Sequence, residues 1–167
     1  IIGFSHIHSW TMGGLLTMPV TGPLKIKPGE ENEPDSGYRS RINHKNEKAS
    51  LSYYSVLLDD YNIKAELTST TRTGFQRYTF PKSDSSRILF DLENGSEYPY
   101  EVRWASISKV SDYEIEGFST QSSYDEPTNL LNDYTVYFVA RVDKPMKSFG
   151  TWVNGYVDTT SSICWGR

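Results

Sequence analysis

Apolar and polar side chains alternate with a period of two along most of this chain. The clearest case is residues 134–142, where Tyr134, Val136, Phe138, Ala140 and Val142 fall on one face. Because successive side chains of a β-strand point to opposite faces, the pattern predicts strands with one buried face. It predicts further strands at residues 53–58, 63–68, 75–80, 87–92, 101–107, 113–118 and 148–153.

Turn residues, not helices, separate these runs. The turn signals include Asn62, Thr73-Gly74 and Asn154-Gly155, and no segment of useful length has the 3.6-residue period of a helix. Strands that follow one another in this way predict an antiparallel β-sandwich. We expect a single domain over residues 1–167, with long irregular loops at 28–46 and 118–132, where ligand contacts are common.

Charge and composition exclude several classes of protein. The 167 residues carry a net charge of -4 without a basic block, so nucleic acid is not an expected partner. No apolar run reaches the length of a membrane span. The single cysteine, Cys164, excludes an internal disulfide and a multi-thiolate metal site.

The first twenty-two residues hold the candidate site. His6, His8 and Trp10 are spaced so that an extended backbone would place all three on one face. A metal site would need a third ligand, which the motif lacks. The histidines therefore serve as hydrogen-bonding groups, either to structural partners or to a ligand. With aromatic residues at 14% of the chain, the rings pack on strands or stack on sugars.

Catalytic machinery is not visible. Hydrolysis of a glycoside usually needs two carboxyl groups that flank the scissile bond. Asp59 and Asp60 are adjacent, so they point apart on an extended backbone, and they suit a turn. Glu114 and Glu116 share the solvated face of a predicted strand. No nucleophile elbow, phosphate-binding loop or dinucleotide motif is present.

Four blocks, in order, give the chain a family resemblance. They are Gly3-Phe4-Ser5-His6-Ile7-His8 with Met18-Pro19-Val20-Thr21-Gly22; Tyr53-Tyr54-Ser55-Val56 with Leu58-Asp59-Asp60-Tyr61 and residues 63–68; Thr71-Arg72, Gly74-Phe75 and residues 77–81; and residues 136–141 with Phe149-Gly150. Together they resemble the N-terminal domain of glycoside hydrolase family 92, the calcium-dependent exo-acting α-mannosidases. Ser9 and Gln76 depart from the family's usual Glu and His.

The resemblance implies a large, galactose-mutarotase-like β-sandwich (a supersandwich), truncated at both ends. Its expected partners are a helical (α/α)6 catalytic domain of the same protein and a mannose-containing glycan. The acid, the base and the calcium would belong to that domain, so this chain would hold no cofactor and be inactive alone. His6, His8 and Trp10 would contact substrate or the catalytic domain. The parent would be a secreted, periplasmic or cell-surface bacterial enzyme.

Two other functions remain open from the residues alone. The chain could be a stand-alone carbohydrate-binding module that uses its aromatic side chains as a platform. It could also be a purely structural sandwich that docks a partner domain.

Overall fold

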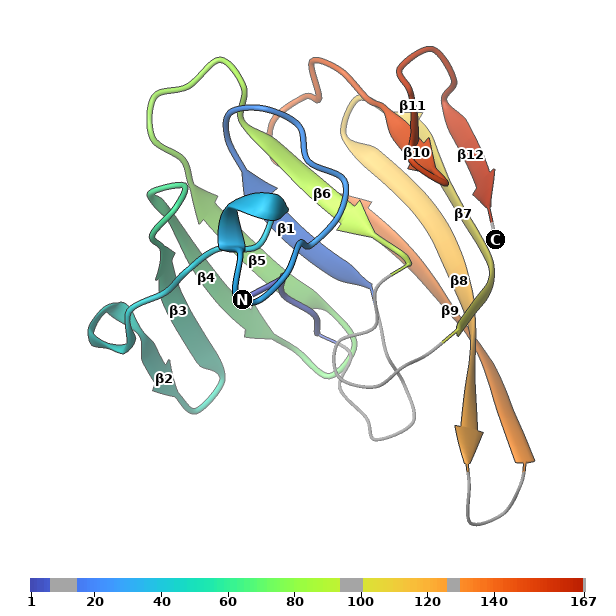
Figure 1. Cartoon of the computed structure of the whole chain (residues 1–167), viewed down its shortest axis with the longest axis horizontal. Helices are drawn as coiled ribbons and strands as arrows, with labels where there is room; N and C mark the ends of the chain where they lie inside the picture. The colour runs from blue at the N-terminus through green and yellow to red at the C-terminus, as the bar shows by residue number, and fades with distance from the viewer. Residues whose placement is uncertain (7–14, 94–100, 126–129, 167) are drawn as a thin grey trace. The chain divides into compact units, whose positions relative to one another are not determined.

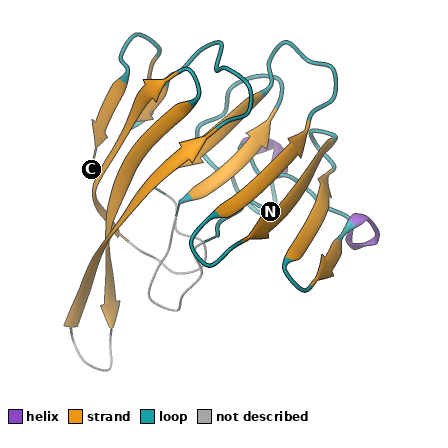
Figure 2. Cartoon of the chain, turned by 180° about the vertical axis from the view of Figure 1, so that it is seen from behind, coloured by secondary structure: helices purple, strands orange, loops and turns teal. Residues whose placement is uncertain are grey.

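The computed structural model describes residues 1–6, 15–93, 101–125 and 130–166, and these are almost entirely strands and loops (Figure 2). The only helical segments among them are two 3-10 turns, η1 (Pro34–Ser36) and η2 (His44–Asn46). Every strand pairing in the described residues is antiparallel. The predicted all-β, antiparallel fold class is therefore confirmed.

The contacts divide the chain into two compact units. The first comprises Ile1–His6 and Leu16–Asp91, and the second contains the described residues from Leu92 onward. Each unit has its own sheets. The expectation of a single domain over residues 1–167 stays a prediction.

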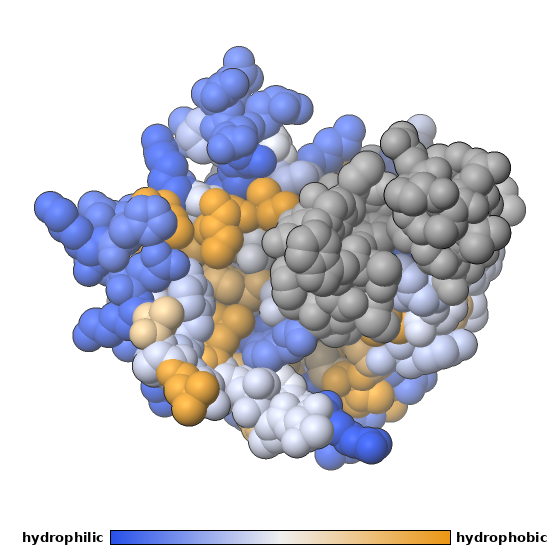
Figure 3. Space-filling view, turned by 90° about the horizontal axis from the view of Figure 1, so that it is seen from below, coloured by the Kyte–Doolittle hydropathy of each residue, from blue (hydrophilic) through white to orange (hydrophobic). Residues whose placement is uncertain are grey.

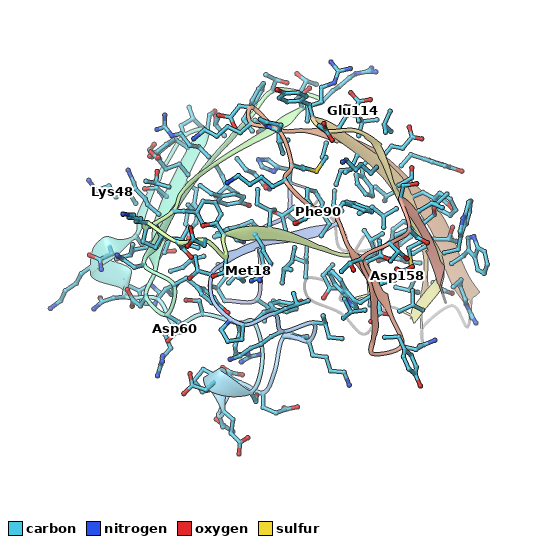
Figure 4. The ribbon with its side chains drawn as sticks, turned by 90° about the horizontal axis from the view of Figure 1, so that it is seen from above. Met18, Lys48, Asp60, Phe90, Glu114 and Asp158 are labelled. Carbon is cyan, nitrogen blue, oxygen red and sulfur yellow. The ribbon has the colours of Figure 1, made fainter. Side chains whose placement is uncertain are left out.

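The first unit holds a four-stranded meander and a two-stranded sheet (Figure 1). The meander runs in the order β2 (Lys48–Ser50), β3 (Tyr53–Leu58), β4 (Ile63–Ser69) and β5 (Gly74–Thr79). The second sheet pairs β1 (Leu16–Val20) with β6 (Arg87–Asp91). Figure 4 shows Met18 on β1 and Phe90 on β6, whose ribbons run side by side.

The alternation in β4 produces the core of this unit. Ile63 and Ala65 are completely buried, and they join Val56 and Leu58 from β3. The β3–β4 hairpin closes at Asn62, whose φ of 51° lies in the left-handed region that asparagine tolerates. The turn predicted at this point is confirmed.

The predicted loop at residues 28–46 is also confirmed, and one tyrosine anchors it. Tyr38 is 1% exposed, and its hydroxyl donates to Asp91 Oδ2 on β6 at 2.5 Å. The Tyr61 hydroxyl donates to the backbone carbonyl of Tyr38 at 2.9 Å. Arg41 bonds the Asp60 carboxylate at the β3–β4 turn. The loop is therefore fixed to the core although it has little regular structure.

The second unit is built on a long sheet in the order β12-β7-β8-β9. These strands are β12 (Ile163–Gly166), β7 (Glu101–Ser111), β8 (Glu114–Asp125) and β9 (Leu130–Arg141). A short hairpin pairs β10 (Thr151–Val153) with β11 (Tyr156–Asp158). Its turn is the predicted Asn154-Gly155, and both residues have positive φ, as a tight hairpin turn requires.

The prediction of an irregular segment at residues 118–132 is wrong, because β8 continues to Asp125 and β9 begins at Leu130. The polar residues that suggested a loop form hydrogen bonds within the sheet. Gln121 is 1% exposed, and its amide donates to Ser119 and accepts from the Tyr134 hydroxyl. A buried polar side chain is tolerated in a strand when its hydrogen bonds are satisfied.

Candidate functional site

Of the three predicted site residues, the structure describes only His6. His8 and Trp10 lie outside the described residues. His6 belongs to the first unit and lies two residues after Phe4, which forms an isolated antiparallel bridge with Thr17 on β1. This bridge, with Phe4 N to Thr17 O and Thr17 N to Phe4 O both at 2.9 Å, carries the opening segment along β1 toward the meander.

Both ring nitrogens of His6 have partners within the fold. Nε2 lies 2.9 Å from the carbonyl oxygen of Thr68 on β4, and Nδ1 lies 3.2 Å from Nε2 of Gln76 on β5. A carbonyl oxygen can only accept, so His6 Nε2–H donates and Nδ1 accepts from the Gln76 amide. In this arrangement both ring nitrogens are engaged, and the faces of the ring are the part that remains available to a ligand.

The Gln76 side chain connects His6 to a polar cluster beneath it. Its Oε1 accepts from the Tyr78 hydroxyl at 2.7 Å and from the Thr17 hydroxyl at 2.8 Å. The Thr17 hydroxyl also lies 3.0 Å from the Tyr78 hydroxyl and 3.1 Å from the Phe4 carbonyl oxygen. Burial raises the pKa of Tyr78, so its hydroxyl remains a donor at any ordinary pH. The network fixes the orientation of the His6 ring.

Gly74 leaves the space in which the His6 ring sits. A Cβ atom on Gly74 would lie 2.4 Å from His6 Cγ and 2.5 Å from His6 Nδ1. The position thus needs glycine for the close approach of a side chain, although its backbone is an ordinary strand. Any larger residue would displace the imidazole from Thr68 and Gln76.

An open groove runs past this histidine. It has a volume of about 490 Å³, and the residues that line it include Phe4, Ser5, His6, Tyr53, Tyr54 and Thr68. Aromatic rings, hydroxyl groups and one imidazole line its wall, which is a composition suited to a polar organic ligand. Figure 3 shows that apolar patches on the lower face of the molecule are interrupted by hydrophilic residues.

The carboxyl groups near the meander are engaged in ion pairs. Glu66 accepts from the Tyr53 hydroxyl at 2.7 Å, from Lys64 Nζ at 3.1 Å and from Arg77 Nε at 2.9 Å. Hydrogen bonds from Arg77, then from Tyr53 and Lys64, lower the pKa of Glu66 to about 2. Asp60 lies in the predicted turn, where the backbone and the guanidinium group of Arg41 donate to its carboxylate. Neither carboxyl group can serve as a general acid at neutral pH.

We expect the hydrogen bonds and ion pairs of Glu66 to make the thermal stability of the fold depend on pH. The folded-state pKa of about 2 lies below the ordinary 4.5, so its contribution is fully present above pH 4.5 and is lost as the pH falls toward 2. Glu66→Gln should lower the thermal midpoint at pH 7 and flatten its decline between pH 4.5 and 2. Thermal unfolding across pH 2–7 measures this, and the same decline in both proteins would contradict it.

A double substitution provides the control for this prediction. Glu66→Gln and Arg77→Gln remove the two ends of one ion pair, so together they should destabilise the chain by less than the sum of their separate effects.

No group of three His, Cys, Asp or Glu side chains that could hold a metal ion occurs within the described ranges. His44 bonds Glu47 at 2.6 Å, and the Tyr54 hydroxyl donates to the same carboxyl group at 2.6 Å. Three residues that position His6 were not predicted as site residues: Thr68, Gly74 and Gln76. Of these, only Gln76 could have been noticed in the sequence, because it departs from the family's usual histidine.

Comparison with known proteins decides the family. The chain matches the model of the glycosyl hydrolase family 92 N-terminal domain over residues 1–165. The chain belongs to this family. Among curated proteins, none matches the chain. The predicted resemblance to family 92 is thus confirmed, and it covers nearly the whole sequence.

Two solved structures extend the match to three dimensions. Both are of the family GH92 alpha-mannosidase BT3965 from Bacteroides thetaiotaomicron, one of them in complex with mannoimidazole. Each is 32% identical to this family 92 domain over 94% of its residues, with a TM-score of 0.84. The match confirms the predicted β-sandwich fold class. The chain spans about a fifth of the length of those structures, 20% and 21%.

Proposed function

We propose that this chain is the non-catalytic N-terminal domain of an α-mannosidase that removes terminal α-linked mannose from glycans. The observation that carries the proposal is the match over residues 1–165 to the N-terminal domain of family 92. A solved relative is an α-mannosidase that binds mannoimidazole, and this chain corresponds to a fifth of it. The carboxyl groups described above, Asp60 and Glu66, are tied to arginine and lysine, which agrees with an acid and a base located elsewhere.

In this proposal the chemistry takes place in a helical domain on which the chain docks. A carboxylate of that domain would activate water while a carboxylic acid protonates the leaving oxygen, with inversion at the sugar. The calcium ion that the family resemblance implies would belong to that domain also. This chain would shape one side of the pocket through His6, His8 and Trp10.

The hydrogen bonds of His6 are consistent with a role as a fixed wall of the pocket. A wall residue needs a fixed orientation, and Thr68 and Gln76 provide it by holding both ring nitrogens. The same bonds leave the exposed imidazole ring as the contact surface, so it would act by shape and stacking and not as a base.

We propose a secreted, periplasmic or cell-surface bacterial location for the parent, as for a glycan-degrading enzyme. None of the helices in the described ranges is long and apolar enough to span a membrane.

The test compares the 167-residue chain with the longer polypeptide that contains it. Only the longer protein should hydrolyse α-mannosides. Within that protein, Gly74→Ala should displace His6 and lower kcat/KM by about tenfold or more, because small misplacements of a pocket wall are costly. Gly150→Ala is the milder control, since its Cβ would approach no atom closer than 3.3 Å. Mannosidase activity in the 167-residue chain would show that the assignment of catalysis is wrong.

A further inference from the structure

A row of aromatic side chains crosses the long sheet of the second unit. Trp165 on β12 is in register with Ser106 on β7, Ser106 with Phe118 on β8, and Phe118 with Tyr137 on β9. Partners in register point to the same face, so these side chains form one line across the four strands. The ring centroids of Phe118 lie 6.0 Å from Trp165 and 5.6 Å from Tyr137.

A second line runs beside the first on the same face. Trp104 is in register with Thr120, and Thr120 with Thr135. The Trp104 ring lies 6.1 Å from the Trp165 ring, and the two threonine hydroxyls lie 2.9 Å apart. The two lines together, which we term the aromatic row, comprise Trp165, Ser106, Phe118, Tyr137, Trp104, Thr120 and Thr135. The line on the other side consists of Ile163, Ser108, Glu116 and Val139, so the aromatic character ends there.

The rings of the aromatic row are exposed. Tyr137 is 77% exposed, Trp165 is 51% exposed and Trp104 is 42% exposed. Strand packing, which is the usual role of such residues, would bury them, so these three rings exceed what the sheet itself needs. The seven residues carry no charge, and they combine apolar ring faces with hydroxyl groups.

We propose that the aromatic row is a binding surface for a neutral glycan, with pyranose rings stacked on Tyr137 and Trp165. The C–H face of a pyranose is apolar and suits an aromatic ring, while its hydroxyl groups suit Thr120 and Thr135. The seven residues present no charge themselves, which suits an uncharged ligand, and the carboxyl group of Glu116 borders them on the neighbouring line. The site lies within the second unit and needs none of the residues around His6, so it goes beyond the function proposed above.

The tilt of the rings limits which glycan fits. The interplanar angles are 40° for Trp104 and Trp165, 67° for Phe118 and Trp165, and 44° for Phe118 and Tyr137. The exposed rings therefore face different directions and do not form one flat plane. Separate sugar residues of a soluble, branched chain match such a surface, whereas the flat face of a crystalline polysaccharide does not.

The experiment is affinity electrophoresis of the 167-residue chain in native gels that contain soluble branched α-mannan, a branched galactan or a branched β-glucan. A glycan that binds the chain should slow its migration relative to a gel without glycan. Tyr137→Leu and Trp165→Leu keep an apolar side chain but remove the ring, and each should raise the dissociation constant about tenfold or more. Because the two residues are on different strands, a folding defect in one variant leaves the other as a test.

Three controls make the result specific. Tyr137→Phe keeps the ring and should bind within about twofold of the unchanged chain. Tyr156→Leu alters a tyrosine that is 83% exposed on β11 and should have no effect. Gly74→Ala should also leave retardation unchanged, so a failure here is separate from a failure of the proposed enzyme role. Circular dichroism confirms that each variant is folded.

Two results would overturn the proposal. One is that no glycan of the panel retards the unchanged chain. The other is that the Leu variants bind as well as Tyr137→Phe, which would show that these rings do not bind the glycan. Light scattering adds a check of the same face: a dimer that the Leu variants retain and a Tyr137→Asp variant loses would mark the face as an apolar protein-docking surface and would also contradict the proposal.

Discussion

Leu58→Ala should lower the free energy of unfolding by about 2–5 kcal/mol, the usual range for a buried leucine. Leu58 is completely buried at the end of β3, opposite Ile63 on β4. The substitution removes its contacts and leaves a cavity, because the paired backbones of β3 and β4 hold their positions and do not move in to fill it. Chemical denaturation, monitored by circular dichroism, gives the change.

Leu51 provides a matched control for this prediction. It lies a few residues earlier, before β3, and is 98% exposed. Leu51→Ala should change the free energy of unfolding by less than about 0.5 kcal/mol, as is usual for surface substitutions. Equal effects of the two leucine substitutions would show that the core of the first unit is not where the structure places it.

Tyr38→Phe is the second substitution with a large expected effect, about 3 kcal/mol of destabilisation. It deletes only the hydroxyl that donates to Asp91 Oδ2 at 2.5 Å, in a pair that is 1% and 2% exposed. A buried carboxyl group that loses a donor keeps its desolvation penalty, which is larger for charged groups than for neutral ones. The free energy of unfolding from denaturant titration measures the loss.

The matched control is Tyr156→Phe, the same change at a tyrosine that is 83% exposed. It should leave stability unchanged, because water replaces the lost hydrogen bond. If Tyr38→Phe were as neutral as this control, the long loop at residues 28–46 would not be anchored through Asp91.

The strands that alternate in polarity were predictable, whereas a fully buried strand such as β1 was not. β4 has one buried and one polar face, so its period of two is visible in the sequence. In β1, all five residues are buried, so no alternation exists to detect. β1 also contains Pro19, which weighs against a strand by composition alone, although it is tolerated where no hydrogen bond needs its nitrogen.

The candidate site was predictable only in part, for a reason of distance along the chain. His6 was identified from its own local motif. Its partners Thr68 and Gln76 lie 62 and 70 residues away, and only the folded meander brings them together. Gly74 illustrates the same limit, because its Cβ clash with His6 depends on a contact between distant segments. The family resemblance provided the function class, which neither periodicity nor composition could give.

The pairing of β1 with β6 also sets an order of folding. Each hairpin of the β2–β5 meander joins strands that are neighbours in sequence, whereas the β1–β6 pair joins Val20 to Arg87 across the entire meander. Contacts that close long loops form late, because they cost more chain entropy before they stabilise anything. The meander should therefore form before β1 docks and brings Phe4 and His6 to it. Pulse-labelling hydrogen exchange should then protect β4 amides earlier than those of β1, so that the candidate site is completed last during folding.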